Sequence, residues 1–382
     1  MTSLLVYNAT VYAPNLLPEP KWVFTENGKI TQVGSADQPE PYADQKIDAS
    51  GLLLTPGFID IHVHGAMGYE TMDADLDALL EMSKFYANHG VTSFVPTTWA
   101  VPMETLLPVL QNIKRGKETI HKGANILGAH IESSFICKAK AGAQNPDFIF
   151  PATHEMAQNI IEQDIVKIVT LAPEIPENLA VIPQFTQAGI TVSAGHTCAK
   201  YDDMLAGVKQ GISSCTHTFN AMVGIHHREP GGAGAALTID DLYAEIIADN
   251  IHLHPAILKL AATVKPENRL LLVTDAIRGT GLPDGEYPID SDRKLYISNG
   301  IARLESGNLA GSTLTMENAL KNMVKASGKP LHQILPAVTR NPAALLGVDK
   351  HKGYLKPGYD ADMVLLSPDL KVQTTIIAGD VL

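Results

Sequence analysis

Basic residues are scarce in this sequence: 29 lysine and arginine residues stand against 41 aspartate and glutamate residues, so the formal net charge is -12. A protein that binds nucleic acid or an anionic membrane through its general surface needs a basic face, so we expect neither partner. If the substrate is an anion, the basic side chains that bind it must be confined to the binding site. Long apolar runs are also missing, because no stretch approaches the ~18 apolar residues of a membrane span.

Secretory and cysteine-rich features are equally scarce. The first residues, MTSLLVYNAT, do not join a basic stretch to an apolar core, so we expect a cytoplasmic protein. Only three cysteines occur, Cys137, Cys198 and Cys215, and no two of them form a CxxC pair. This number and spacing argue against a disulfide framework and against a cysteine-rich metal site. We expect each cysteine to be a small buried residue.

Short β-rich runs alternate with helical patterns between about residues 58 and 276. Residues 75–89, for example, have apolar positions at helical spacing and are followed by Gly90. Because strands that alternate with helices build parallel sheets, and eight such units can close on themselves, we predict a (β/α)8 barrel. The eight runs span residues 58–64, 91–97, 124–131, 164–172, 189–196, 211–219, 244–252 and 269–276.

The two flanks of the chain have a different character. Residues 1–50 and 353–382 carry short β patterns separated by turn residues, so we predict one small β-sandwich domain made from residues 1–52 and 353–382. The barrel domain would then span residues 53–352. After the eighth run we expect a hairpin excursion within residues 286–304 and helices near 312–327 and 331–347.

Polar side chains stand at the C-terminal ends of six of these runs, which is where barrel enzymes build their sites. Residues two apart in a strand point to the same face, so the histidines of IHVHG would lie side by side. Imidazole and carboxylate groups suit zinc, iron and related divalent ions, so the sequence predicts a metal site. The candidates are His62, His64, Glu132, His196, His217, His252 and Asp275.

This set of residues indicates metal-assisted hydrolysis. A bound divalent ion lowers the pKa of water to about 7 and can polarise a carbonyl under attack. Asp275 is the best general base, because a carboxylate there can take a proton from the attacking water and return it to a leaving amine. His252 could hold the carbonyl oxygen as negative charge develops on it.

Several longer blocks resemble a known family. The runs DASGLLLTPGFIDIHVHG and GYLKPGYDADMVLL resemble the amidohydrolase superfamily. More narrowly, VSAGHTCA, THTFNAM, HHREPG, LLVTDA and LAGSTLTM are similar to its N-acetylglucosamine-6-phosphate deacetylase family. The resemblance implies a metal-dependent enzyme that hydrolyses N-acetylglucosamine 6-phosphate to glucosamine 6-phosphate and acetate.

The resemblance also implies roles for individual residues. Glu132, His196 and His217 would hold the principal metal ion, and His62 and His64 would hold a second ion that shares Glu132. The ions would be Zn, Fe, Mn or Co, one or two per subunit, with Asp275 as acid and base and His252 at the substrate amide. The remaining substrate contacts would be Asn220, Ala221, His227, Arg228, Leu309, Ala310 and Gly311.

The resemblance implies that Arg228 reaches the site of a neighbouring subunit, and therefore a homodimer. The chain departs from the family at two places. Ser133 and Ser134 replace a glycine and a proline, and Gln144 stands where the family commonly has a histidine that touches the substrate. Gln144 can still donate and accept hydrogen bonds.

Three alternatives stay open at this point. The substrate could be a different N-acyl amino sugar phosphate, or the protein could be a cyclic-amide hydrolase. Hydrolases of that second kind often use a carboxylated lysine at the end of the fourth strand, and Lys167 comes too early in its run for that role. The barrel could also have lost catalysis and act as a sensor or scaffold.

Overall fold

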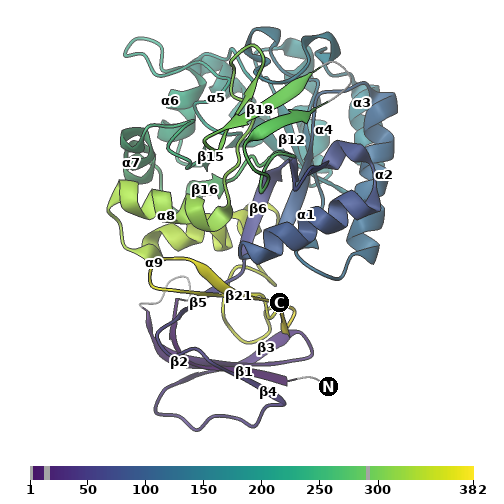
Figure 1. Ribbon diagram of the computed structural model, residues 1–382. Helices are drawn as coiled ribbons and strands as arrows, with labels where there is room; N and C mark the ends of the chain where they lie inside the picture. The colour runs from purple at the N-terminus through teal and green to yellow at the C-terminus, as the bar shows by residue number, and fades with distance from the viewer. Residues whose placement is uncertain (1–2, 13–17, 290–292) are drawn as a thin grey trace.

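The computed structural model describes residues 3–12, 18–289 and 293–382. A barrel forms the upper part of Figure 1, and a small β unit lies beneath it. Parallel strands make the barrel wall, and each overlaps one of the predicted runs. They are β6 (Phe58–Val63), β9 (Val91–Thr98), β11 (Ala129–Glu132), β12 (Val166–Leu171), β13 (Thr191–Ala194), β14 (Ile212–Cys215), β15 (Tyr243–Ile247) and β16 (Leu270–Val273), with a short β10 (Asn125–Ile126) beside β9.

The barrel closes where its first strand meets its last. Val63 of β6 forms a parallel bridge with Ala276, and the Asp275 amide donates to the His62 carbonyl at 3.0 Å. The Thr274 hydroxyl also donates to the Asp60 carboxylate at 2.6 Å. All residues of β6 and β9 are buried, as expected for parallel strands that are covered on both faces. The predicted (β/α)8 barrel is therefore confirmed.

Two strands end at least four residues earlier than the sequence predicts. The sixth predicted run extends to residue 219, but β14 ends at Cys215, and the seventh extends to residue 252, but β15 ends at Ile247. The extra residues instead form loops at the C-terminal rim. His217 and His252 therefore lie on these loops and not on strands.

Helices surround the barrel wall. α1 (Leu76–Asn88) matches the predicted segment, and the Asp75 side chain caps it by accepting from the Asp77 amide. The second predicted C-terminal helix is divided by a 3-10 turn at Leu335–Val338, because Pro336 has no amide hydrogen for a helical bond. The other helices are α2 (Met103–Thr119), α3 (His154–Ile161), α4 (Pro176–Gln187), α5 (Tyr201–Gln210), α6 (Gly231–Thr238), α7 (Pro255–Val264), α8 (Met316–Ser327), α9 (Leu331–Ile334) and α10 (Arg340–Leu345).

Strands from both ends of the chain form the small β unit, and Figure 1 shows the N-terminal strands and β21 together beneath the barrel. In the described residues they make one continuous eight-stranded sheet. β5 pairs with β20, so residues 53–56 belong to this sheet and not to the barrel range that the sequence suggested. The strands are β1 (Ser3–Val11), β2 (Glu19–Glu26), β3 (Lys29–Ser35), β4 (Gln45–Asp48), β5 (Leu53–Pro56), β20 (Met363–Leu366), β21 (Val372–Ile377) and β22 (Asp380–Val381).

The predicted excursion is an antiparallel sheet of β17 (Gly285–Pro288), β18 (Lys294–Ser298) and β19 (Ile301–Leu304). Residues 290–292 of the predicted excursion lie outside the described residues. Leu295 and Ile297 of β18 pack with Ile277 and Ala310. This sheet therefore covers part of the barrel rim. In the described part of the chain, no helix is long and apolar enough to cross a membrane.

Candidate metal centre and active site

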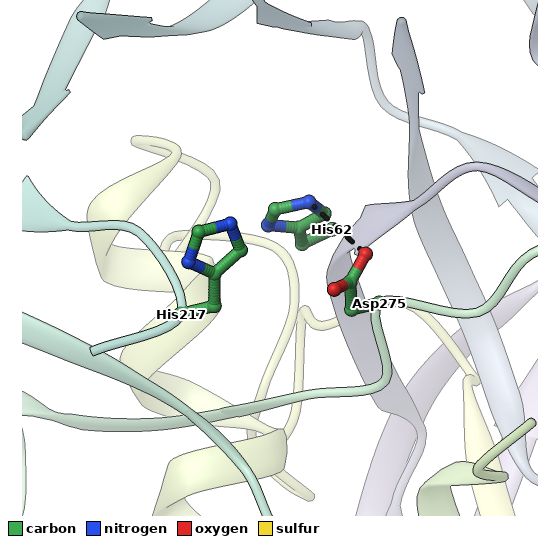
Figure 2. Close-up of side chains that lie close together, drawn as sticks. All are labelled: His62, His217 and Asp275. Carbon is green, nitrogen blue, oxygen red and sulfur yellow. Dashed lines mark ion pairs between the residues drawn. The ribbon is translucent and has the colours of Figure 1, made fainter. Parts of the chain in front are cut away.

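Imidazole and carboxylate groups from five segments meet at the C-terminal rim of the barrel. Their ligand atoms form three overlapping groups, and within each group all atoms lie within 4.8 Å of one another. Figure 2 shows one group, in which the side chains of His62, His217 and Asp275 face a common point. The three groups are Glu132, His196 and His217; His62, His64 and Glu132; and His62, His217 and Asp275.

Glu132 lies at the centre of these contacts. Its Oε1 atom is 3.0 Å from His196 Nε2 and 2.9 Å from His217 Nε2, while its Oε2 atom is 3.4 Å from His64 Nε2. Oε1 also lies 3.7 Å from His62 Nε2, so this oxygen contacts three of the histidines and Oε2 contacts the fourth. Glu132 is the residue that could connect two metal positions.

Gln144 holds this carboxylate in place. Its amide nitrogen donates to Glu132 Oε2 at 2.6 Å, and its amide oxygen accepts from the Ala100 amide at 2.7 Å. Gln144 lines the cavity that these side chains border, but both polar ends of its amide are already hydrogen-bonded within the protein. In the structure, Gln144 therefore orients Glu132, the central residue of the candidate metal centre.

The hydrogen-bond partners of two histidines show which nitrogen is free to bind a metal. His62 Nδ1 faces a carboxylate oxygen of Glu245 at 3.2 Å, and His196 Nδ1 faces the Lys140 carbonyl at 2.7 Å. Carboxylates and carbonyls only accept, so both Nδ1 atoms carry the proton. Each Nε2 atom then presents its lone pair to the centre, which is the arrangement of metal-binding histidines. The donor set fits a divalent cation.

The electrostatics of the cluster support this assignment. Burial alone would lower the pKa of His62, but the surrounding carboxylates of Asp275, Glu245 and Glu132 raise it to about 10. Burial alone would raise the pKa of Asp275, but charge on His62 and the hydrogen bond to His64 lower it to about 2. The buried carboxylates thus require positive charge beside them, and a divalent ion supplies it in place of protons.

Three of the histidine and carboxylate candidates at the strand ends have an uncommon backbone conformation. His196, His217 and Asp275 have φ angles of 47°, 25° and 51°, and each is the second residue beyond the end of its strand. Positive φ is uncommon outside glycine and is found at sites where the fold imposes it. Here it turns the chain sharply after the strand and leaves the side chain over the barrel mouth.

His252 is held by a neighbouring carboxylate. Asp249 Oδ2 is 2.6 Å from His252 Nδ1, and Asp249 Oδ1 accepts from the His252 amide at 2.8 Å. Burial would lower the pKa of His252, but the hydrogen bond and the charge of Asp249 raise it. His252 is therefore well placed to donate a hydrogen bond from Nε2 into the cavity.

These side chains line a cavity of about 160 Å³ at the C-terminal rim of the barrel. The predicted substrate residues Asn220, Ala221, Leu309 and Gly311 also line it. Ala310 instead borders an adjoining small cavity behind Trp99. Arg228 and His227 are exposed, and they contact each other at 2.8 Å without reaching the main cavity.

The two serines that depart from the family both have hydrogen-bond partners for their hydroxyl groups. The Ser133 hydroxyl donates to the Thr170 carbonyl at 2.5 Å, and the Ser134 hydroxyl donates to the Val101 carbonyl at 2.9 Å. Both residues are buried. The loop after β11 is therefore fixed by side-chain hydrogen bonds at the place where the family has glycine and proline.

The expectation for two cysteines was wrong. Cys137 and Cys198 form a disulfide, and neither is fully buried. The loops after β11 and β13 meet at the rim, where the Cys137 amide donates to the His196 carbonyl at 2.8 Å. The sequence does not show this contact, because 61 residues separate the two cysteines. Cys215 is free and buried as expected, and burial raises its thiol pKa to about 12.

Comparison with known proteins agrees with this geometry. The model of the amidohydrolase family matches residues 53–382. The chain belongs to the amidohydrolase family. An N-acetylglucosamine-6-phosphate deacetylase of Lysinibacillus sphaericus is 34% identical to this amidohydrolase over 379 residues, which cover 99% of this chain and 97% of the relative.

Two further relatives extend the comparison. An N-acetylgalactosamine-6-phosphate deacetylase of Escherichia coli O157:H7 is 36% identical over 370 residues, which cover 96% of this chain and 97% of that protein. The crystal structure of N-acetylglucosamine-6-phosphate deacetylase from Pasteurella multocida aligns with a TM-score of 0.93 and 30% identity, covering 100% of this chain and 99% of that one.

Several residues of this amidohydrolase site were not found by sequence reasoning. Glu245 in β15 contacts His62, Trp99 stacks on His64 with ring centroids 4.0 Å apart, and Asp249 orients His252. A signal for Glu245 was present, because a charged residue in the apolar run YAEII is costly to bury without a partner. Lys167 is the second residue of β12, so it lies at the end of the strand away from the rim.

Proposed function

We propose that this amidohydrolase hydrolyses the acetamide of N-acetylglucosamine 6-phosphate and releases acetate and glucosamine 6-phosphate. The observation that carries the proposal is the convergence of Glu132, His196 and His217 with Asp275 and His252 on one cavity. Relatives that bear this name match the chain over nearly its full length. The reaction breaks the bond between the acetyl carbonyl carbon and the sugar nitrogen, with water as the second reactant.

Metal binding is the first part of the proposed mechanism. Glu132, His196 and His217 would hold one divalent ion, and His62 and His64 would hold a second ion beside Glu132. Zn, Fe, Mn and Co all suit such nitrogen and oxygen donors. A bound ion lowers the pKa of water and polarises the amide carbonyl.

Asp275 acts as general base and then as general acid. Its carboxylate lies 3.5 Å from His62 Nε2 and 3.3 Å from His64 Nε2, so it borders the place where water attacks. It takes the proton of the attacking water and delivers it to the sugar nitrogen as the amide bond breaks. Protonation makes the amine a good leaving group.

His252 stabilises the carbonyl oxygen. Asp249 fixes the proton on Nδ1 and favours the charged imidazolium, so Nε2 can donate to the oxygen as negative charge develops. Asn220 and Ala221, with Leu309 and Gly311 across the cavity, contact the sugar and acetyl groups.

We infer that the phosphate is bound by a second copy of the chain. The described residues that line the cavity include no lysine or arginine. Arg228 is exposed and offers a planar set of donors that matches phosphate oxygens. We therefore propose a homodimer in which Arg228, with His227, reaches the cavity of its partner, and we keep the expectation of a cytoplasmic enzyme.

The test is acetate release from purified protein loaded in turn with Zn, Fe, Mn or Co. We expect turnover of N-acetylglucosamine 6-phosphate with at least one ion, and loss of turnover after chelation. No acetate from metal-loaded protein would refute the proposal and favour a sensor or scaffold. N-acetylgalactosamine 6-phosphate should be assayed in parallel, because one relative bears that name. A higher kcat/KM for that sugar would change the assigned substrate and leave the reaction type intact.

A further inference from the structure

Glu245 lies in the middle of β15 and is completely buried. Its Oε2 atom is 3.2 Å from His62 Nδ1 and accepts from the His217 amide at 3.1 Å. One carboxylate oxygen thus contacts the side chain of one candidate metal ligand and the backbone of another. These ligands come from β6 and from the loop after β14, so Glu245 connects the two halves of the centre.

The other oxygen of Glu245 has no hydrogen-bond partner among the described residues. An ionised carboxylate with an unpartnered oxygen is costly to bury, and the neutral amide of glutamine would lower that cost. A role limited to packing would therefore not require a charge at this position. The negative charge of Glu245 has a functional role if it acts on His62.

The contact with Glu245 has two effects on His62. It fixes the proton on Nδ1, so that the Nε2 lone pair faces the centre, and a carboxylate partner makes that lone pair a stronger donor. His64 and His217 lack such a partner, because their Nδ1 atoms are unpartnered in the described structure. On its far side from Glu132 and Asp275, which its Nε2 faces, His64 stacks on Trp99 and has no carboxylate at Nδ1.

We propose that Glu245 is a positioning residue, which orients His62 to bind the second ion at the His62 and His64 position. The inference rests on the proposed metal-dependent hydrolysis and on its second ion. The position formed by Glu132, His196 and His217 does not depend on Glu245 to the same extent, because its contact there is with the backbone of His217 and not with a ligating ring.

The test compares zinc binding to wild-type protein and to Glu245→Gln. Zinc per chain is measured by atomic emission, and the two dissociation constants are measured by competition with a chromophoric chelator. Wild-type protein should bind two ions. Glu245→Gln should bind the second ion about 10 to 100 times more weakly and keep its affinity for the first.

Glu317→Gln is the matched control. Glu317 also faces a histidine, with its carboxylate 2.7 Å from His89 Nδ1, and one of its oxygens is likewise buried without a partner. It lies on α8, outside the metal centre, so this variant should bind two ions with wild-type affinities. The control separates the effect of Glu245 from the general effect of removing a buried charge.

His62→Gln supplies the second comparison. If Glu245 acts through His62, adding Glu245→Gln to His62→Gln should weaken zinc binding no further, because the two changes remove the same contact. Additive losses would overturn the inference, as would equal weakening of both ions in Glu245→Gln. Glu245→Asp, which keeps the charge but withdraws it from His62, should also lose the second ion and serves if the glutamine variant fails to fold.

The outcome is separable from that of the proposed reaction. Wild-type protein that binds a single zinc ion would overturn the inference even if it releases acetate. Wild-type protein that binds two ions, with selective loss in Glu245→Gln, would support the inference even if no acetate is released, and the proposed substrate would then be wrong.

Discussion

The disulfide between Cys137 and Cys198 should contribute strongly to the stability of the barrel. It closes a loop with a sequence separation of 61 residues. In the chain-entropy description, removing the cross-link from a loop of this length costs about 4 kcal/mol at 25 °C. Since whole proteins are stable by about 5–15 kcal/mol, this is a large share of the total. It corresponds to a roughly thousandfold change in the ratio of folded to unfolded protein.

Urea unfolding of oxidised protein, reduced protein and the Cys137→Ser/Cys198→Ser variant measures this effect. We expect the midpoint to fall on reduction and in the variant, and we expect reductant to have no further effect on the variant. Thiol titration in denaturant should find one free thiol, that of Cys215, before reduction and three after it. Three free thiols without reductant would refute the disulfide itself. One free thiol with no shift in midpoint would refute the entropic reasoning.

Three further predictions concern catalysis. Asp275→Asn should lower kcat by several orders of magnitude while KM changes little, because the amide keeps the shape but cannot accept the proton; near-normal kcat in steady-state assays would contradict its role. Arg228→Ala should raise KM for the phosphorylated sugar far more than for N-acetylglucosamine, and equal changes for both sugars would remove the phosphate assignment. Asp249→Asn should shift the alkaline limb of the kcat profile to lower pH, because the carboxylate raises the pKa of His252 and activity requires its protonated form; an unshifted limb would contradict this.

Much of the fold follows from the sequence because its signals are local. Alternating apolar runs and helical periodicity depend on residues a few positions apart, so every barrel strand overlaps a predicted run. The ends of strands are less well determined. β14 stops at Cys215 because the chain turns through positive φ at His217, and nothing in the residue type of a histidine indicates that conformation.

The candidate site was predictable as a set of ligand types and not as a network of contacts. Histidine and carboxylate residues near strand ends identify the rim, since all parallel strands end on the same side of a barrel. Whether Gln144 contacts a sugar or Glu132 depends on side-chain placement across the cavity. The pairing of Cys137 with Cys198 depends on two loops that meet only after the barrel has closed.

The small sheet has a consequence for how the protein is made. β5 is paired on one side with β1 and on the other with β20, which follows the whole barrel in the chain. During synthesis, one edge of β5 therefore remains unpaired until the ribosome has translated every barrel strand. An unpaired edge of this kind is a place where chains associate wrongly. Arrival of β20 thus covers the edge of β5 and protects the new protein from aggregation.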